Sequence, residues 1–173
     1  MGKDKSVMVV GNNMGEPDPS KSKDAYILIK NTAEIENLLG KEYSNDNDNP
    51  YVCTTFVQEV LEKSGYNSNE FLPGGQRVVD SVKILDDQLI TPDSGKNPEE
   101  GTYVFYHIDD DNVSGHTGII NFDSKGNATI LHNGSDGNNG SNVNERTRSS
   151  LQGSFDTWFP ENNNPVKYKR IGE

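Results

Sequence analysis

Three short segments in the second half of the chain constrain its fold more than any other feature. β-Branched and aromatic residues are concentrated in TYVFYHI at 102–108, HTGIINF at 116–122 and NATILHN at 127–133, and turn-forming residues flank each segment. The sequence DSKG at 123–126 suits a tight turn between the last two. We therefore predict three consecutive antiparallel strands, followed by a last strand in NPVKYKRI at 164–171.

Helical patterns precede these strands. Residues 53–64 and 76–90 each repeat apolar side chains along one helical face. Residues 25–39 show roughly the same spacing, although a strand at 25–30 followed by a short helix from Thr32 fits them as well. Three helices followed by an antiparallel sheet give an α+β fold class.

The length and composition suit one domain. A chain of 173 residues leaves little room for a second core, and only 31% of its residues are hydrophobic. The 21 Asn and 17 Gly residues favour turns, so we expect long polar loops at 66–75 and 133–145. We predict a flexible N-terminal segment over 1–24 and a single folded domain over 25–173.

The charge balance argues against several kinds of partner. Sixteen basic and 27 acidic residues give a net charge of −11, which disfavours nucleic acid and anionic membrane surfaces but suits a cationic group. No stretch approaches the roughly 20 apolar residues of a membrane span, and the apolar run at 7–10 is too short for a secretory signal. We therefore expect a soluble protein with no membrane insertion. It is cytosolic, an excised domain of a larger protein, or exported to the periplasm or extracellular space without a classical signal peptide.

The single cysteine is the first candidate for chemistry. Cys53 cannot form a disulfide within the chain, and it falls in the first turn of the helix expected over 53–64. The free N–H groups and the dipole of a helix N-terminus favour a thiolate, so we predict a lowered pKa and a nucleophilic sulfur. The alternative is a small buried side chain in a core helix.

Two histidines are the candidates for partners of this cysteine. His116 opens one predicted strand and His132 lies near the end of the next, so a hairpin closed at 125–126 brings both to the same end of neighbouring strands. That hairpin would place residue 119 opposite His132. A cysteine, a histidine and a third polar group that orients the imidazole are what thiol catalysis needs. Taken singly, each histidine also fits a solvated or capping position.

The order of these motifs resembles a known enzyme family. Similarity to the NlpC family of papain-like cysteine peptidases, with the CHAP amidases as close relatives, is carried by LLGKEYSNDNDNPYVCTTFVQEVLEKSGY at 38–66, NPEEGTYVFYH at 97–107, GHTGIINF at 115–122 and ILHNGS at 130–135. The resemblance implies a papain-like catalytic domain. In that fold N-terminal helices, with the cysteine at a helix start, pack on a small antiparallel sheet.

The resemblance also assigns roles to single residues. It implies that Cys53 is the nucleophile, His116 the base and His132 the third member, and it places Tyr43 near the oxyanion. For Tyr43, an ordinary loop aromatic packed on the core is the alternative. The chain departs from the family pattern in places: the usual Asp-Cys-Ser-Gly reads VCTT at 52–55, and the usual Pro-Gly-Asp is replaced by PEEG at 98–101.

The function implied by the resemblance is hydrolysis of amide bonds in the stem peptides of bacterial peptidoglycan. Such an enzyme could be a secreted antibacterial effector whose partner is an immunity or inhibitor protein. Two other classes stay open. One is a papain-like acyltransferase, deamidase or transglutaminase that acts on protein, and the other is a non-catalytic binding module on the same fold.

Metal and cofactor sites find little support in the sequence. Zinc could in principle be bound by His107, His116 and His132, but no closely spaced ligand pair such as H-x-x-x-H is present. The acidic runs at 46–49 and 109–112 lack the glycine and glutamate of a calcium loop, and no phosphate-binding glycine motif occurs. We therefore expect no metal and no cofactor, and we expect His107 to be dispensable.

Overall fold

The computed structural model describes residues 15–41, 52–93, 96–108, 115–134, 142–147 and 166–173. Within these residues three α-helices precede five strands in the sequence. The helices are α1 (Ser22–Thr32), α2 (Val52–Lys63) and α3 (Val78–Leu85). The strands are β2 (Gly101–Ile108), β3 (Gly115–Phe122), β4 (Ala128–Gly134), β5 (Asn142–Thr147) and β6 (Lys167–Arg170). Short 3-10 turns are present at η2 (Ile35–Asn37), η3 (Ser68–Glu70) and η4 (Asp86–Gln88).

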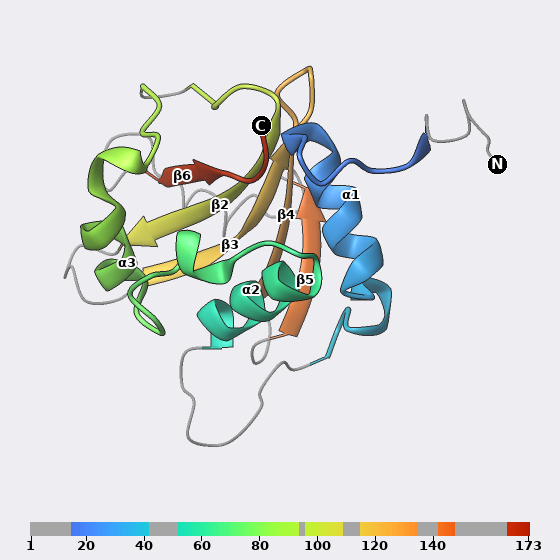
Figure 1. The fold of residues 1–173 in the computed structure, drawn as a ribbon, viewed down its shortest axis with the longest axis horizontal. Coiled ribbons are helices and arrows are strands. Elements are labelled where there is room, and N and C mark those ends of the chain that lie inside the picture. The colour runs from blue at the N-terminus through green and yellow to red at the C-terminus, as the bar shows by residue number, and fades with distance from the viewer. Residues whose placement is uncertain (1–14, 42–51, 94–95, 109–114, 135–141, 148–165) are drawn as a thin grey trace, which may run out of the picture.

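The described strands form one antiparallel sheet in the order β5-β4-β3-β2-β6 (Figure 1). β2, β3 and β4 are consecutive antiparallel partners, as the sequence predicts, and β6 pairs with the other edge of β2. The predicted turn at 123–126 is also present, since the N–H of Gly126 donates to the carbonyl of Asp123 at 3.0 Å. The described part of the chain is therefore an α+β fold with three helices and a small antiparallel sheet.

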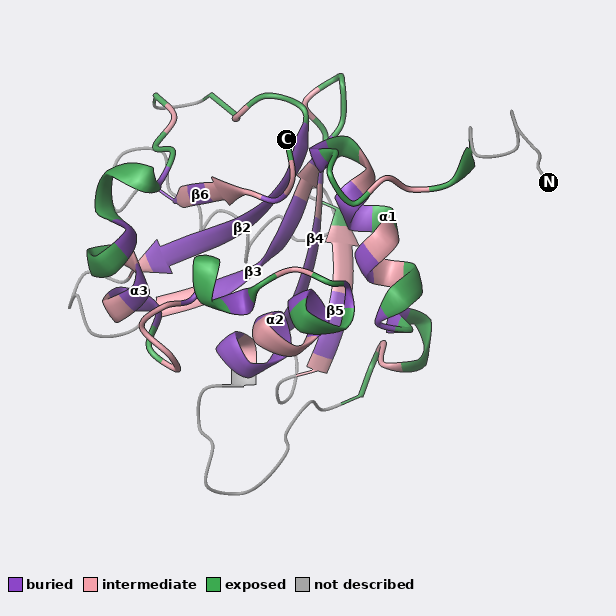
Figure 2. Cartoon of the chain, viewed as in Figure 1, coloured by how far each residue is buried: buried purple, intermediate pink, exposed green. Residues whose placement is uncertain are grey.

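The helices pack on one face of this sheet (Figures 1 and 2). α2 packs on β3 and β4, whereas α1 and α3 contact β2 and β3. The core on this face includes Ala25, Ile29, Phe56, Val57, Val60, Leu61, Val104, Tyr106, Ile119 and Leu131. Because successive side chains of a strand point to opposite faces, the intervening residues form a second buried cluster. That cluster consists of Tyr103, Phe105, Ile120, Phe122, Ala128, Ile130, Val166 and Tyr168.

α2 carries the predicted cysteine and follows the predicted pattern closely. Its apolar stripe, formed by Phe56, Val57, Val60 and Leu61, is fully buried. Gly65 has a left-handed backbone with φ of 89°, which ends the helix where the sequence suggests. At 12 residues α2 is the longest described helix, and within the described ranges no helix has the length and apolar character needed to cross a membrane.

α1 begins and ends earlier than the pattern at 25–39 predicts. It starts at Ser22, inside the segment expected to be flexible, and ends at Thr32. The hydroxyl of Ser22 donates to the carbonyl of Thr102 at 2.9 Å and accepts from the Thr102 N–H at 2.8 Å, which ties the start of α1 to β2. Glu34 then takes a left-handed backbone with φ of 52°, so η2 forms a separate turn. The alternative of a strand at the start of this segment is wrong.

β5 is the element that the sequence did not predict, because its residues fall largely inside the expected loop at 133–145. It pairs with β4 along one edge. Along its other edge, the N–H of Gly40 donates to the carbonyl of Val143 at 2.8 Å, and the Val143 N–H donates to the carbonyl of Lys41 at 2.9 Å. β5 is polar apart from Val143, so backbone pairing rather than an apolar pattern defines it.

Candidate active site

Cys53 lies in the first turn of α2 and is half-buried. Its sulfur faces three backbone N–H groups, those of Cys53 itself, Thr54 and Thr117. Thr117 belongs to β3 and directly follows His116. The packing of α2 on β3 therefore places the thiol against the peptide bond that joins His116 to Thr117.

His116 and His132 are in direct contact. The Nε2 atom of His116 lies 2.9 Å from the Nδ1 atom of His132, a hydrogen bond whose donor depends on the tautomers. The ring centroids are 5.0 Å apart and the rings are perpendicular. His132 is fully buried, whereas His116 keeps some accessible surface. The structure thus brings together the two histidines that the sequence singles out.

The strand register corrects the sequence prediction by one residue. We predicted that residue 119 lies opposite His132, but Ile119 pairs with Leu131 in the structure. Residues directly opposite one another share a face, so the predicted register would have placed His132 on the opposite face from His116. The observed register places both histidines on one face, where they can meet.

Two glycines leave the space that these rings occupy. A Cβ built on Gly134 would lie 2.8 Å from Nδ1 of His132 and 2.9 Å from Cε1 of His116. A Cβ on Gly118 would lie 2.7 Å from the Phe105 ring and 2.8 Å from the Cβ of His132. All four distances are shorter than real contacts allow, so any larger residue at either position would displace a ring.

His107 lies closer to the site than the sequence suggested. It pairs with His116 across β2 and β3, and its side chain is buried. We expected it to lie away from the chemistry, but it is a direct neighbour of His116. Among the residues that the structure describes, no group of three or more His, Cys, Asp or Glu side chains is placed to hold a metal ion.

Burial sets the protonation states of the site. It raises the pKa of the Cys53 thiol, and the N–H groups of Thr117, Thr54 and Cys53 only partly oppose this shift. The lowered pKa that a helix N-terminus predicts is therefore not observed. For His116, burial and then the neighbouring rings of His132 and His107 lower the pKa to about 3. Near neutral pH the Cys53 thiol and the His116 imidazole are thus both neutral.

Some predicted features lie outside the described residues. Tyr43 falls in the range 42–51, and so does the acidic run at 46–49. The second acidic run, at 109–112, lies outside them as well. The described chain stops at Lys41 on one side of Tyr43, where it is bonded to β5.

Gln76 is a site residue that the sequence analysis missed. Its side-chain oxygen accepts hydrogen bonds from the hydroxyls of Thr54 and Thr55, the two residues that follow Cys53. Nothing in its local sequence signals this contact except the two glycines before it, which mark a turn. The contact joins residues more than 20 positions apart, so only the fold reveals it.

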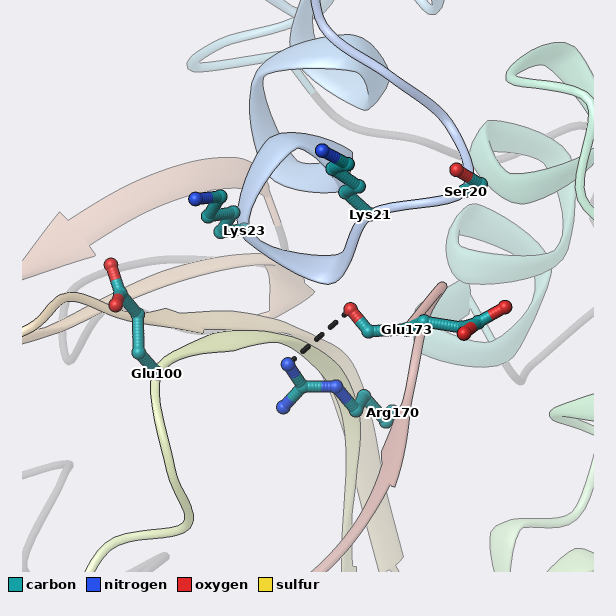
Figure 3. Close-up of a pocket in the computed structure, with 6 residues that line it drawn as sticks. All are labelled: Ser20, Lys21, Lys23, Glu100, Arg170 and Glu173. Carbon is teal, nitrogen blue, oxygen red and sulfur yellow. Dashed lines mark hydrogen bonds between the residues drawn. The ribbon is translucent and has the colours of Figure 1, made fainter.

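A charged hollow of about 470 Å³ lies elsewhere, at the start of α1 (Figure 3). Its lining residues are Ser20, Lys21, Lys23, Glu100, Arg170 and Glu173. Arg170 donates to the backbone carbonyl of Glu173 at 3.4 Å within it. The hollow is next to the start of β2, whereas His107 lies near the end of that strand, so the two sites are at opposite ends of the sheet. Its lining contains neither a thiol nor an imidazole, and we therefore place the candidate chemistry at Cys53.

Comparisons of the chain with models of protein families, with curated proteins and with solved structures found no match. The candidate site therefore rests on its own geometry. A cysteine at a helix start lies beside a strand that carries His116, and His116 is bonded to His132. A thiol and a pair of hydrogen-bonded histidines are the kinds of group that thiol catalysis uses.

Proposed function

We propose that this chain is a papain-like cysteine hydrolase that cleaves amide bonds, with Cys53 as nucleophile and His116 as base. The observation that carries the proposal is the position of the Cys53 thiol against the peptide between His116 and Thr117, with His116 bonded to His132 at 2.9 Å. His132 would fix the orientation and tautomer of the His116 ring. The resemblance of the cysteine and histidine motifs to the NlpC family supports the same roles.

The neutral resting state suits a general-base mechanism. A carbonyl carbon of the substrate would be attacked by the Cys53 sulfur while His116 takes the thiol proton. The N–H groups near the sulfur, those of Cys53, Thr54 and Thr117, could stabilise the resulting oxyanion. His116 would then protonate the leaving amine, which leaves a thioester on Cys53. Water, deprotonated by His116, would attack the thioester and release the carboxylic acid and the free thiol.

The proposed substrate is the stem peptide of bacterial peptidoglycan. The joint resemblance of CTTFV, GHTGII and ILHNGS to a family that acts on these peptides supports this choice. The net charge of −11 would favour a substrate with a free amino group, such as the side chain of a diamino acid. In the same proposal the protein is an antibacterial effector that is neutralised by an immunity protein.

A non-catalytic binding module on the same fold is the second candidate. The observation in its favour is the state of the two reactive groups. Burial raises the pKa of Cys53 and lowers that of His116, so no thiolate–imidazolium pair exists at rest. In the hydrolase proposal this state is the reactant of a base-catalysed attack, and in the binding-module proposal it is inert.

Mass spectrometry of purified peptidoglycan after incubation with the protein tests the proposal. We expect new amino and carboxyl ends in the stem peptides, uncut glycan chains, and no change with the Cys53→Ala variant. If peptidoglycan is untouched but a protein is deamidated, acylated or crosslinked in a Cys53-dependent way, the enzyme belongs to the acyltransferase alternative. If peptidoglycan is bound equally well by wild type and Cys53→Ala, and neither cleaves it, the binding module is correct.

A further inference from the structure

The first turn of α2 is held from outside the helix. Thr54 and Thr55, which directly follow Cys53, both donate their hydroxyl hydrogen bonds to Oε1 of Gln76, at 2.9 and 3.0 Å. The hydroxyl oxygen of Thr54 also lies 3.1 Å from the main-chain oxygen of Gln76. Both threonine side chains are buried. One carboxamide oxygen therefore satisfies two buried hydroxyls beside the nucleophile.

Hydroxyls inside a helix usually bond in a different way. A serine or threonine there commonly donates to the carbonyl four residues earlier, as Thr32 does to Leu28 in α1 at 2.6 Å. Thr54 and Thr55 lie in the first turn of α2, and their hydroxyls donate to Gln76, which lies outside the helix. The acceptor comes from Gln76, and the start of α2 thereby depends on a distant segment.

The segment that carries Gln76 is fixed by its own contacts. The N–H of Gly74 donates to the hydroxyl of Ser81 in α3 at 2.9 Å, and a Cβ on Gly74 would overlap the backbone of Ser81. Gly75 has φ of 72°, a backbone that favours glycine, and its N–H donates to the carbonyl of Leu72 at 3.2 Å. These two glycines allow the turn that presents Gln76 to α2.

The same segment also reaches the strand that carries the base. α3 begins at Val78, two residues after Gln76. A Cβ built on Gly115 would lie 3.1 Å from the Cβ of Val78, and Gly115 directly precedes His116 in β3. Gln76 therefore contacts the turn that carries Cys53, and the start of α3, two residues later, lies against the strand end that carries His116.

We propose that Gln76 is a positioning residue of the active site. By accepting from Thr54 and Thr55, it fixes the first turn of α2 and hence the direction of the Cys53 sulfur relative to His116. The inference rests on the proposed function, since a fixed sulfur matters for catalysis by that thiol. Gln76 acts through α2 and is not assigned a contact with substrate.

Alkylation of Cys53 by iodoacetamide tests this inference without any substrate, because the chain has one cysteine. When Gln76→Ala frees the turn, water and reagent reach the sulfur more easily. We expect alkylation near neutral pH to become about five-fold faster and its pH midpoint to fall, because desolvation of the thiol decreases. Gln76→Glu keeps an acceptor oxygen and should restore the slow rate. Gln88→Ala makes the same truncation at an exposed glutamine and should change nothing.

A double-mutant cycle separates this role from a general loss of stability. Replacing Thr54 and Thr55 with valine removes both hydroxyls at nearly constant volume and should accelerate alkylation as Gln76→Ala does. Adding Gln76→Ala to that background should then have no further effect. In the hydrolysis assay, the Gln76→Ala variant should lose kcat with KM unchanged, although its thiol is more reactive toward the reagent.

Three results would overturn the inference: a wild-type alkylation rate in Gln76→Ala, an undiminished effect of Gln76→Ala without the two hydroxyls, or failure of Gln76→Glu to restore the rate. The alkylation assays do not depend on the proposed function. If they give the expected pattern while no substrate is cleaved, Gln76 positions the thiol and the hydrolase proposal fails. If cleavage depends on Cys53 but not on Gln76, the hydrolase proposal stands and the positioning role of Gln76 fails.

Discussion

At the level of single residues, Cys53 and His116 are each kept in the neutral form by burial. A helix N-terminus alone predicts a thiolate, but desolvation outweighs the three N–H groups that face the sulfur. The imidazole of His116 is likewise desolvated and has two further histidines beside it. In the proposed hydrolase mechanism, proton transfer to His116 as general base would therefore accompany attack on the substrate.

The first prediction concerns the reactivity of the thiol. Because the pKa of Cys53 is raised, alkylation by iodoacetamide should be slow at mildly acidic and neutral pH. Its rate should increase only at pH values above the pKa of a free thiol. The rate is measured from pH 5 to 10 against a small model thiol, after confirming that the protein stays folded. Faster modification of Cys53 than of the model thiol at pH 5 to 6 would show that the sulfur is a thiolate after all.

The second prediction separates the roles of the histidines. His116→Ala removes the proposed base and should lower kcat by about 10²- to 10⁴-fold, whereas His132→Ala should leave more activity because an orienting group does not transfer the proton. His107→Asn should have an intermediate effect through the pKa of His116. The pH profile of kcat/KM checks this. Loss of His107 should raise the pKa of His116 and so shift the acidic limb of the profile to higher pH. Equal loss in all three variants, with activity restored by added zinc, would indicate a metal site instead.

The third prediction concerns the space beside the histidine pair. A methyl group at Gly134 would meet both rings, so Gly134→Ala should separate His116 from His132 and lower activity at least ten-fold. Gly15→Ala is the matched control, because a Cβ there meets nothing within 4 Å. Activity and the unfolding midpoint are measured for both variants. Full activity in Gly134→Ala would mean that the contact between the rings is not needed.

At the level of secondary structure, α2 and the strands β2, β3 and β4 could be predicted from the sequence. Their apolar residues recur at helical or alternating spacing, and the turn at 123–126 has the chemistry that a hairpin needs. The early start of α1 could not be predicted, since it depends on hydrogen bonds between Ser22 and the distant Thr102. β5 was missed because its polar residues carry no apolar pattern.

Candidate residues were easier to predict than their arrangement. Cys53, His116 and His132 are recognisable from residue type and position along their elements. A register error of one residue was enough to place the two histidines on opposite faces, because the hairpin loop does not reveal its pairing. The contacts of His107 and Gln76 with the site involve residues from separate elements, so no local sequence pattern predicts them.

The fourth prediction tests how β5 is held in the fold. The hydroxyl of Tyr26 in α1 donates to the Glu145 carboxylate in β5 at 2.8 Å, and the Lys30 ammonium lies 2.8 Å from the same oxygen. Tyr26→Phe should therefore lower the free energy of unfolding by about 1 to 2 kcal/mol. Tyr66→Phe is the control, because its hydroxyl bond to Pro19 is exposed and should contribute less. Urea denaturation measures both, and equal losses would contradict a specific tie between α1 and β5.

At the level of the whole molecule, the buried histidines couple folding to pH. An unfolded chain protonates His116 below about pH 6.5, but the folded protein does so only near pH 3. Between these values the unfolded state binds more protons, so stability falls as the pH is lowered from 6.5 toward 3. The same groups that define the site therefore make the fold sensitive to acid.

The fifth prediction follows from this coupling. His116→Gln should flatten the dependence of unfolding free energy on pH, by up to about 1.4 kcal/mol per pH unit between pH 6.5 and 3. Other groups titrate in the same range, so the difference between wild type and variant at each pH is the informative quantity. Urea denaturation at half-unit steps measures it. Parallel curves for the two proteins would mean that His116 titrates in the folded state as it does in the unfolded state.

The central claim, that Cys53 forms a thioester with an acyl group of a peptidoglycan stem peptide, is tested most directly by intact-protein mass spectrometry. Wild-type protein is mixed with purified stem-peptide fragments and quenched in acid within the first turnovers, which preserves a thioester. The account predicts an added mass equal to the acyl half of the substrate, located on Cys53, greatly reduced in His116→Ala and absent in Cys53→Ala. Cleavage of the same fragments by Cys53→Ala, with no added mass on the wild-type protein, would contradict it.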